Sequence, residues 1–340
     1  MWLSGILTVV RMTVWVRPPV PEEGRLDISF LLGLLCMYDM HNRREEMDIL
    51  QVDGLSKRYD GFYLDNISFT LPPGYIMGFI GRNGAGKTTT IKAMLDLVHR
   101  DSGQVTILGK DYYANELELK KMIGLTLGGV AYYPTTRLST ITDVFKRFFD
   151  TWDEKQYRAY LTRFDLDEKK RVNQLSAGMT VKYALALALS HHAKLLVLDE
   201  PTSGLDPVSR DDMLDLFREI IQEGDRSILF STQITSDLEK CADYITYIRD
   251  GKLVASMEAD GFREAYLLVK GRKDQLTSLA ASLIGYKATD LGFTGLARAG
   301  DRGLLEGCEV SEPTIEDIMV YHERQTTRLD TDEDQRSTSK

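Results

Sequence analysis

Residues 81–89 fit the pattern G-x-x-x-x-G-K-[ST] without substitution. Gly84 and Gly86 let the backbone curl so that successive N–H groups can point at phosphate oxygens. Lys87 is then placed to reach the β- and γ-phosphates of a nucleotide, and the hydroxyl of Thr88 is placed to ligate Mg²⁺. The candidate phosphate-binding residues are Gly81, Arg82, Asn83, Gly84, Ala85, Gly86, Lys87, Thr88 and Thr89.

The elements around this loop are those that the pattern requires. An apolar run, residues 75–80, leads in and predicts a buried strand. Residues 88–97 lead out with helical spacing, and residues 101–103 predict a turn that closes the segment. A glycine-rich turn with an incidental lysine is the alternative, but the strand before the loop and the helix after it favour phosphate binding.

Two adjacent acidic residues, Asp199 and Glu200, follow a second apolar run, Leu195–Leu198. Such a run is typical of a strand buried in a parallel sheet, and α/β proteins bind ligands at the C-terminal ends of these strands. We expect Asp199 to hold the magnesium shell, directly or through water, and Glu200 to polarise an attacking water. Two surface acids in a turn are the alternative, which the preceding apolar run and the upstream phosphate loop disfavour.

An aromatic side chain ahead of a phosphate loop can stack on a nucleotide base. Tyr59 is the candidate, and Phe62 and Tyr63 are the other two. The alternative is a tyrosine packed in a loop, since buried aromatic side chains most often belong to the core. Asp60 and Gly61, directly after Tyr59, predict a turn.

Length and composition narrow the class of protein. The chain has 340 residues, which allows one large domain with additions or two domains. Its hydrophobic content of 43% is ordinary for a globular protein, and its net charge of −9 argues against a general nucleic-acid binder. The three cysteines form no C-x-x-C pair, so neither a zinc site nor a disulfide framework is indicated.

Residues 1–46 differ in composition from the rest. The apolar run 28–38 is shorter than the about 20 residues that a spanning helix needs, and Arg11 interrupts the apolar stretch 1–16. A membrane anchor or a signal segment is one interpretation. We favour the other, that translation starts at Met47 and that residues 1–46 are not part of the natural protein. N-terminal mass analysis tests this hypothesis, which a native peptide spanning residues 30–46 would contradict.

From residue 132 to residue 172 the pattern becomes helical, aromatic and charged, which predicts a helical subdomain inserted into an α/β core. Two apolar faces at helical spacing are expected to lie in the core. The first comprises Val144, Phe145, Phe148 and Phe149, and the second comprises Tyr157, Tyr160, Leu161 and Phe164.

The remaining segments extend the same alternation of helices and strands. Residues 181–190 predict a strongly apolar helix, and residues 213–221 an amphipathic one. Residues 227–231 predict a strand that leads to Gln233, and residues 236–239 form a capping-box pattern for a further helix. Asp250-Gly251, between two strand-like runs, predicts a hairpin.

Together these motifs resemble the nucleotide-binding subunits of ABC transporters, over about residues 48–255. A phosphate loop is common to many NTPases, whereas Leu-Ser-x-Gly before a carboxylate strand is particular to this family. The features occur in the family's order: Tyr59, residues 81–89, Leu175–Met179, Leu195–Glu200, Ser203–Asp206 and Thr232-Gln233. Residues 185–206 and the long C-terminal extension look closest to the acetoin-utilisation (Ytr-like) branch.

The resemblance implies an α/β fold with a P-loop NTPase (RecA-like) core, an inserted α-helical subdomain and an N-terminal antiparallel β subdomain. It implies an ATP-binding domain at 47–255, with the helical subdomain at 131–172 docking on the membrane partner. A small C-terminal α+β extension would follow at 256–322, either regulatory, dimerising or a stabilising cap, and residues 323–340 are polar and predict a disordered tail.

The resemblance also implies roles for single residues. Tyr59 matches the aromatic that stacks on adenine, and Glu200 matches the catalytic base. Ser176 and Gly178 match the signature that caps the γ-phosphate of ATP held by the opposing subunit, so that two ATP would lie between two such domains. Asp206 matches the loop that crosses this dimer interface.

Three departures from the family's pattern bear on hydrolysis. Ala177 and Met179 replace two residues of the usual Leu-Ser-Gly-Gly-Gln, but Ala177 adds only a methyl group, so we expect ATP capping to survive. The family's magnesium-sensing glutamine is expected near Gly128, where no glutamine occurs. Gln233 takes the place of the switch histidine. It can donate the same hydrogen bond to the γ-phosphate but cannot become cationic, so we expect slow hydrolysis.

The resemblance therefore implies a subunit that binds and hydrolyses ATP with Mg²⁺ and powers a separately encoded membrane transporter through ATP-driven dimerisation. Its partners would be a membrane-spanning subunit and a second ATP-binding subunit, in a homo- or heterodimer, without nucleic acid, at the cytoplasmic face of the cell membrane. The alternative is a regulatory ATP-binding subunit that hydrolyses slowly or not at all, in one version paired with a competent homologue. ABC proteins of translation and DNA repair carry tandem cassettes or a long coiled coil, and the sequence shows neither.

Overall fold

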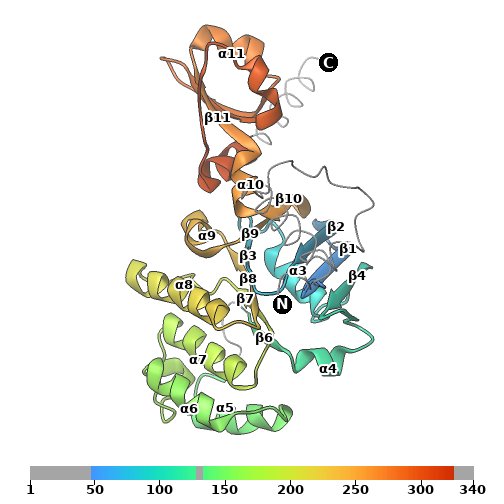
Figure 1. The fold of residues 1–340 in the computed structure, drawn as a ribbon, viewed down its shortest axis with the longest axis vertical. Coiled ribbons are helices and arrows are strands. Elements are labelled where there is room, and N and C mark those ends of the chain that lie inside the picture. Colours follow the sequence, from blue (N-terminus) through green and yellow to red (C-terminus); the bar gives the residue numbers. More distant parts are fainter. Residues whose placement is uncertain (1–46, 128–132, 325–340) are drawn as a thin grey trace, which may run out of the picture. The chain divides into compact units, whose positions relative to one another are not determined.

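In the computed structural model of the chain, residues 47–127 and 133–324 are described. The predictions for residues 1–46, for Gly128 and for residues 325–340 lie outside them. Within the described residues a ten-stranded sheet has the order β5-β4-β1-β2-β10-β9-β3-β8-β7-β6 (Figure 1). Its strands are β1 (Leu50–Tyr59), β2 (Phe62–Leu71), β3 (Ile76–Ile80), β4 (Ser102–Ile107), β5 (Lys110–Asp111), β6 (Ile123–Thr126), β7 (Leu195–Asp199), β8 (Ser227–Thr232), β9 (Tyr244–Arg249) and β10 (Lys252–Glu258).

The two halves of this sheet differ in strand direction. Strands β9, β3, β8, β7 and β6 pair in parallel, whereas β2, β1, β4 and β5 pair antiparallel. This arrangement confirms the expected α/β core with an N-terminal antiparallel β subdomain. Its helices are α3 (Lys87–Met94), α4 (Glu116–Lys120), α5 (Leu138–Phe145), α6 (Glu154–Arg163), α7 (Ala177–Ser190), α8 (Pro207–Gln222) and α9 (Thr235–Cys241), with 3-10 turns at Lys146–Phe148 and Val172–Gln174.

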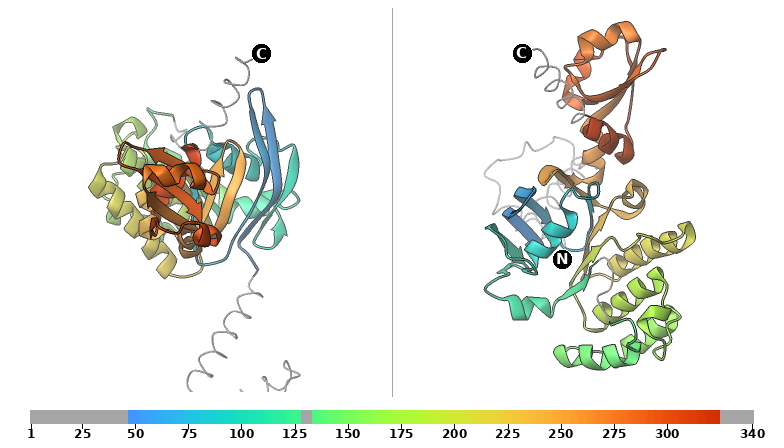
Figure 2. Two further views of the ribbon diagram at one scale, coloured as in Figure 1. Left: turned by 90° about the horizontal axis from the view of Figure 1, so that it is seen from above. Right: turned by 180° about the vertical axis from the view of Figure 1, so that it is seen from behind.

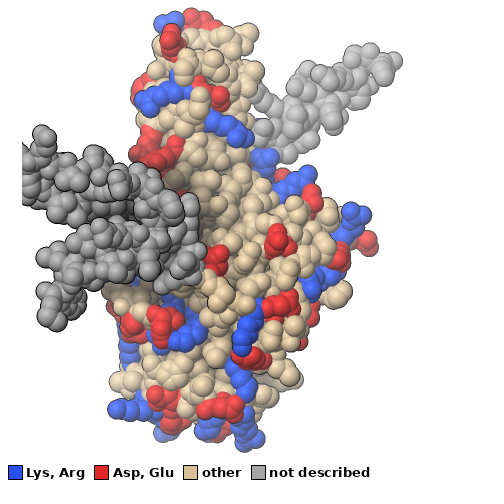
Figure 3. All heavy atoms as spheres, turned by 45° about the vertical axis from the view of Figure 1, so that its right-hand side comes forward, with Lys and Arg blue, Asp and Glu red and all other residues tan. Residues whose placement is uncertain are grey.

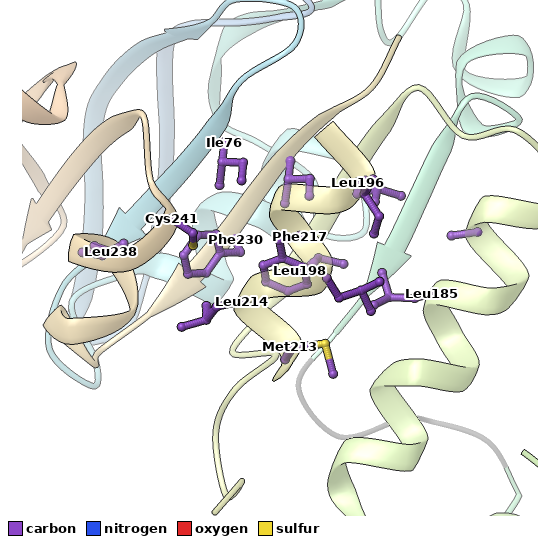
Figure 4. Close-up of a cluster of buried hydrophobic side chains, with 14 of the residues drawn as sticks. Ile76, Leu185, Leu196, Leu198, Met213, Leu214, Phe217, Phe230, Leu238 and Cys241 are labelled. Atoms are coloured by element: carbon purple, nitrogen blue, oxygen red, sulfur yellow. The ribbon is translucent and has the colours of Figure 1, made fainter. Parts of the chain in front are cut away.

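The central strands are buried on both faces, as a parallel sheet covered by helices requires. Alternate side chains of a strand point to opposite faces. In β7, Leu196 and Leu198 join the core that α7, α8 and α9 cover, and Figure 4 shows them near Phe217 of α8. Leu195 joins the opposite core, which α3 and the antiparallel strands cover. The sheet therefore holds the phosphate loop, after β3, between two packed layers.

The segment before α7 contains short helices, as expected. Seen from behind in Figure 2, they gather with α7 on the side of the sheet away from the blue strands β1 and β2. The second expected apolar face lies in the core. The first does not lie there as a whole, because Val144 is 51% exposed and Phe148 is 67% exposed. Phe149 instead stacks on the buried ring of His191, with ring centroids 3.9 Å apart.

A smaller antiparallel sheet, in the order β12-β13-β11-β14, forms the C-terminal α+β extension. One face packs through Leu267 and Val269 against Leu279 of α11. The other packs through Leu268 against a final helix, residues 315–324, which contributes Ile318. The elements are α10 (Ala259–Glu264), β11 (Tyr266–Gly271), α11 (Lys273–Leu279), β12 (Leu283–Ala288), β13 (Phe293–Arg298), a 3-10 helix at Ala299–Leu304 and β14 (Glu309–Ser311).

Several local expectations need correction. Tyr59 is the last residue of a long strand, β1, and not part of a loop, as the alternative interpretation had it; it pairs with Phe62 across the confirmed Asp60-Gly61 turn. In the segment 101–103, where a turn was expected, β4 already begins at Ser102, which pairs with Ser56 of β1. The capping box at 236–239 is wrong, since α9 already begins at Thr235.

The start of the expected disordered tail is also wrong. Glu323 and the residue after it belong to the final helix. The side chain of Glu323 contacts both the phosphate-loop residue Arg82 and Tyr247 of β9.

On the face shown in Figure 3, basic and acidic side chains are interspersed over the described surface.

Candidate nucleotide-binding site

The phosphate loop, the end of the β1–β2 hairpin and the ends of β7 and β8 surround one pocket of about 570 Å³. It brings together residues that are far apart in the sequence. The lining residues are Tyr59, Phe62, Arg82, Asn83, Gly84, Gly86, Lys87, Thr88, Thr89, Glu200, Ser203 and Gln233. Gly81 and Ala85 of the loop are buried and do not line it.

Steric constraints explain why glycine occupies three positions of the loop. The φ angle is +84° at Gly84 and +113° at Gly86, a region that residues with a Cβ rarely adopt. A Cβ on Gly81 would lie 2.4 Å from the carbonyl oxygen of Ile248. The loop can therefore follow this path only with glycine at these positions, and α3 begins directly after it at Lys87.

Lys87 lies at the base of the pocket. Its ammonium group donates to the carbonyl oxygens of Gly81 (2.8 Å) and Arg82 (3.3 Å), and it lies 3.0 Å from Oε1 of Glu200. The loop's own carbonyl groups thus orient the lysine, and its charge faces the carboxylate at the end of β7.

Asp199 and Thr88 meet at the same edge. The Thr88 hydroxyl donates to Oδ2 of Asp199 (2.9 Å), and the Ser231 hydroxyl donates to Oδ1 (2.6 Å). Mg²⁺ prefers oxygen ligands and often takes only one or two from the protein beside substrate phosphates. The hydroxyl and carboxylate oxygens, next to the phosphate loop, therefore fit a magnesium ion.

Glu200 has an unusual backbone and a partly unpaired side chain. Its φ angle is +51°, in the left-handed region, and its N–H donates to Oγ of Ser231 (3.0 Å). Within the described residues its Oε2 is buried without a hydrogen-bond partner. Residues held in such strained backbone conformations cluster at active sites, and Glu200 lines the pocket.

Two of the three aromatic candidates line the pocket. Tyr59 is 43% exposed, and the Lys57 ammonium lies 5.4 Å from its ring centroid. Phe62 packs against the loop, since a Cβ on Gly86 would lie 2.9 Å from its ring. Tyr63 is not a lining residue and lies under the Arg58 guanidinium. Tyr59 presents the more exposed ring.

The structure leaves the other predicted residues outside the pocket lining. Ser176 is the N-cap of α7 and accepts from the N–H of Met179 (3.2 Å). Asp206 is the N-cap of α8, and the Ser209 hydroxyl and N–H hold the pKa of its carboxyl below the usual range. Gly178 approaches Leu205, which a Cβ would meet at 3.3 Å. These residues stand at exposed or half-exposed helix starts.

Ser203 and Ser231 were missed by the sequence analysis as site residues. Ser203 lines the pocket, and Ser231 bonds both Asp199 and the Glu200 backbone. The sequence did carry one signal for Ser231: it stands near the end of the apolar strand β8, which pairs with β3, the strand before the phosphate loop. Gln233, exposed at the end of β8, does line the pocket.

Comparison with known proteins agrees with this geometry. The model of a protein family described as "ABC transporter" matches residues 64–203. The chain is 28% identical over 233 residues to the ABC transporter ATP-binding protein YtrB of Bacillus subtilis (strain 168), covering 68% of this chain and 80% of that protein. It is 32% identical over 219 residues to the bacitracin transport ATP-binding protein BcrA of Bacillus licheniformis, covering 64% and 72%.

Two further proteins extend the comparison. The daunorubicin resistance ATP-binding protein DrrA3 of Streptomyces coeruleorubidus is 30% identical over 262 residues, with 75% of this chain and 82% of that protein covered. A solved structure titled as the ATP binding subunit of an ABC transporter superposes with a TM-score of 0.57 at 25% identity, covering 63% of this chain and 92% of that one.

Proposed function

Because the chain belongs to the ATP-binding proteins of ABC transporters, similar to YtrB as its sequence predicts, we propose that it hydrolyses ATP with Mg²⁺ and powers a separately encoded membrane transporter through ATP-driven dimerisation. Members of this family are transport-coupled ATPases. The observation that carries the proposal is the meeting of Lys87, Thr88, Asp199 and Glu200 at one edge of the sheet.

The pocket supports the binding of ATP. The N–H groups of the loop, the start of α3 and the Lys87 ammonium supply positive potential for the phosphates. The exposed ring of Tyr59, which also lines the pocket, supplies a surface on which adenine can stack. Because the phosphate-binding groups and this ring belong to one pocket, the triphosphate and the base can bind together.

The same pocket supports hydrolysis. Glu200 has a buried carboxylate oxygen available to accept a proton from an attacking water. Gln233 can donate an amide N–H toward the γ-phosphate. Thr88 and Asp199 would hold Mg²⁺, which when bound neutralises charge on the phosphate oxygens. The backbone of Glu200, bonded to Ser231, keeps the base in place.

Dimerisation is supported by what lies outside the pocket. Ser176 and Gly178 stand at the start of α7, and Asp206 stands at the start of α8, where a second subunit can reach them. Val208, also on α8, is 71% exposed. We propose that these residues complete the site of the opposing subunit, and that ATP is bound between the two chains.

A membrane-spanning partner is supported by a second surface. Among the described residues, no helix has both the length and the apolar character needed to cross a bilayer. The exposed apolar side chains Val144 and Phe148 lie in the helical segment before α7. We propose that this segment docks on the membrane subunit and that the chain lies at the cytoplasmic face of the membrane. An ATP-binding domain at 47–255, paired in a homo- or heterodimer, is part of the same proposal.

One observation favours a second candidate function. Gln233 stands where the family's switch histidine is expected, and it cannot carry the cationic charge that histidine can. A subunit that binds ATP but turns it over slowly could regulate a transporter or pair with a competent homologue. The two candidates share the ATP site and differ in the rate of phosphate release.

The test is phosphate release and oligomeric state with Mg-ATP. Parent protein should release phosphate, and Lys87→Ala should abolish ATP binding measured by calorimetry. Glu200→Gln keeps the shape of the base but not its basicity, and should elute as a dimer from a sizing column with Mg-ATP. The exposed Glu306 provides a matched control, Glu306→Gln. Unchanged ATP affinity in Lys87→Ala would overturn the site, and a parent without turnover would favour the regulatory function.

A further inference from the structure

Asp237, on the first turns of α9, is a buried carboxylate that none of the roles above uses. Its exposed fraction is 1%. Burying a carboxylate is costly unless it is paired and hydrogen-bonded, and burial raises the pKa of Asp237. The contacts of the Asp237 carboxylate and backbone lead to three different loops of the proposed ATP site.

The first contact reaches the loop after the catalytic carboxylates. The hydroxyl of Thr202, itself fully buried, donates to Oδ2 of Asp237 at 2.6 Å. Thr202 comes two residues after Glu200, and the N–H of Ser203, a pocket residue, bonds back to the Glu200 carbonyl oxygen (3.2 Å). Asp237 therefore holds the tight turn that carries the proposed base.

The second contact reaches the end of β8. The N–H of Asp237 donates to the carbonyl oxygen of Ile234 (3.1 Å). The N–H of Ile234 in turn donates to the hydroxyl of buried Thr232 (3.0 Å), so these bonds span the backbone on both sides of Gln233. Movement of Gln233 toward a γ-phosphate would therefore be transmitted to Asp237 over a short, packed path.

The third contact reaches the loop that ends in Asp206. Nε of Arg210, on α8, lies 4.0 Å from Oδ1 of Asp237, and Nη2 of Arg210 donates to the carbonyl oxygen of Leu205 (3.4 Å). Within the described residues, Nε and Oδ1 are both buried without a hydrogen-bond partner. A shift of about 1 Å would bring them to the distance of a charge-assisted bond.

We propose that Asp237 is a positioning residue that couples Gln233, the loop of Glu200 and the Leu205–Asp206 loop. This inference rests on the proposed function of the same site. When Gln233 engages the γ-phosphate, Asp237 moves with α9 and closes onto Arg210. That closure places the Leu205–Asp206 loop where the second subunit can bind it, while Thr202 holds Glu200 in a fixed position relative to Gln233.

The test compares variants that remove single contacts. Asp237→Asn keeps size and an acceptor for Thr202 but removes the charge that faces Arg210. Thr202→Val removes the hydroxyl with little change of shape, whereas Thr202→Ser retains it. Asp243 provides the control: it stands between α9 and β9 and accepts from the N–H of Ile76 in β3, away from the three loops.

Misplaced catalytic groups lose rate more than affinity. Asp237→Asn and Thr202→Val should lower kcat for phosphate release roughly 10-fold or more. The Kd of a fluorescent ATP analogue should stay within about twofold, since the phosphate loop is untouched. Thr202→Ser should recover most of the turnover, and Asp243→Asn should match the parent. The kcat of the double variant Asp237→Asn/Thr202→Val should be little lower than that of either single variant, because both substitutions affect the same chain of contacts.

Two results would overturn the inference. One is an unchanged kcat in Asp237→Asn. The other is a loss of kcat, affinity and thermal stability in parallel, which indicates a structural role only. A parent protein without turnover would contradict the proposed hydrolysis rather than the coupling through Asp237. ATP-dependent dimerisation in the Glu200→Gln background then decides, because adding Asp237→Asn should raise the ATP concentration needed for dimers. An unchanged requirement there would also overturn the inference.

Discussion

The ammonium nitrogen of Lys87 lies 3.0 Å from Oε1 of Glu200, and only 5% and 19% of their side chains are exposed. The residue that should bind phosphate is thus paired with the residue that should activate water. ATP brings its own negative charge to Lys87, so its phosphates must compete with Glu200 for the lysine. The strength of ATP binding and the readiness of the base are linked through this pair.

The first prediction concerns this competition. Glu200→Gln removes a negative charge beside the phosphate site and releases Lys87 from its ion pair. ATP affinity should therefore rise about fivefold, equivalent to about 1 kcal/mol for a partly shielded pair. Calorimetry with Mg-ATP measures it, with Glu306→Gln as the control. An affinity equal to that of the parent would show that the pair does not oppose binding.

The second prediction concerns Gln233 in the pocket lining. Gln233→His should speed phosphate release, because histidine can donate a bond and also carry positive charge near the phosphoryl oxygens. Gln233→Ala should slow release further, by less than the about 10²–10³ that a lost transition-state donor costs elsewhere. ATP affinity should change little in both. Equal turnover in Gln233→Ala and the parent would remove residue 233 from the mechanism.

The third prediction concerns Glu323 in the final helix. Its carboxylate lies 3.3 Å from Nη1 of Arg82, a pocket residue that is 69% exposed, and accepts from the hydroxyl of Tyr247. Glu323→Gln leaves Arg82 with an unpaired charge facing the nucleotide, so ATP affinity should rise about two- to fivefold at low salt. Salt should reduce the gain, since exposed charges are screened.

The control for this prediction lies on the same helix. Glu316 is exposed there, and Glu316→Gln changes the net charge by the same amount. A gain in affinity of equal size in both variants would mean that net charge, and not the contact with Arg82, is responsible. Titrations of a fluorescent ATP analogue at two salt concentrations separate the two.

The fourth prediction concerns stability in acid. Burial lowers the pKa of His191 to about 4, and its Nδ1 lies 3.2 Å from the carbonyl oxygen of Lys121. The pKa of an unfolded histidine is about 6.5. Between these values the unfolded chain binds the proton and the folded chain does not. The free energy of unfolding should therefore fall as pH drops below 6.5, by about 2 kcal/mol at pH 5 for this group.

Urea unfolding at pH 7.5 and pH 5.0 measures this effect. His191→Gln should be less stable than the parent at pH 7.5 but lose less stability between the two values. Burial, with Arg249 and Arg298 nearby, also lowers the pKa of His322 to about 4, so part of the dependence should remain. The exposed His99 supplies the control variant His99→Gln. Parallel losses in His191→Gln and the parent would contradict the assignment.

The sequence alone was sufficient for the phosphate loop, because its chemistry depends on neighbours within one turn of chain. Gly84, Gly86 and Lys87 act through local backbone geometry, which their spacing determines. The same holds for β7, whose first four residues are all apolar, since burial on both faces leaves no room for polar alternation. These local signals were enough to assign the family and the α/β class.

Tertiary structure decided which side chains meet. The helical period places Phe148 on an apolar face, but only packing determines that this ring is exposed while Phe149 stacks on His191. The contacts of Asp237 with Thr202, and of Glu323 with Arg82, join segments far apart in the chain. Such pairings depend on how the sheet brings strand ends together, and sequence periodicity carries no information about a partner that distant.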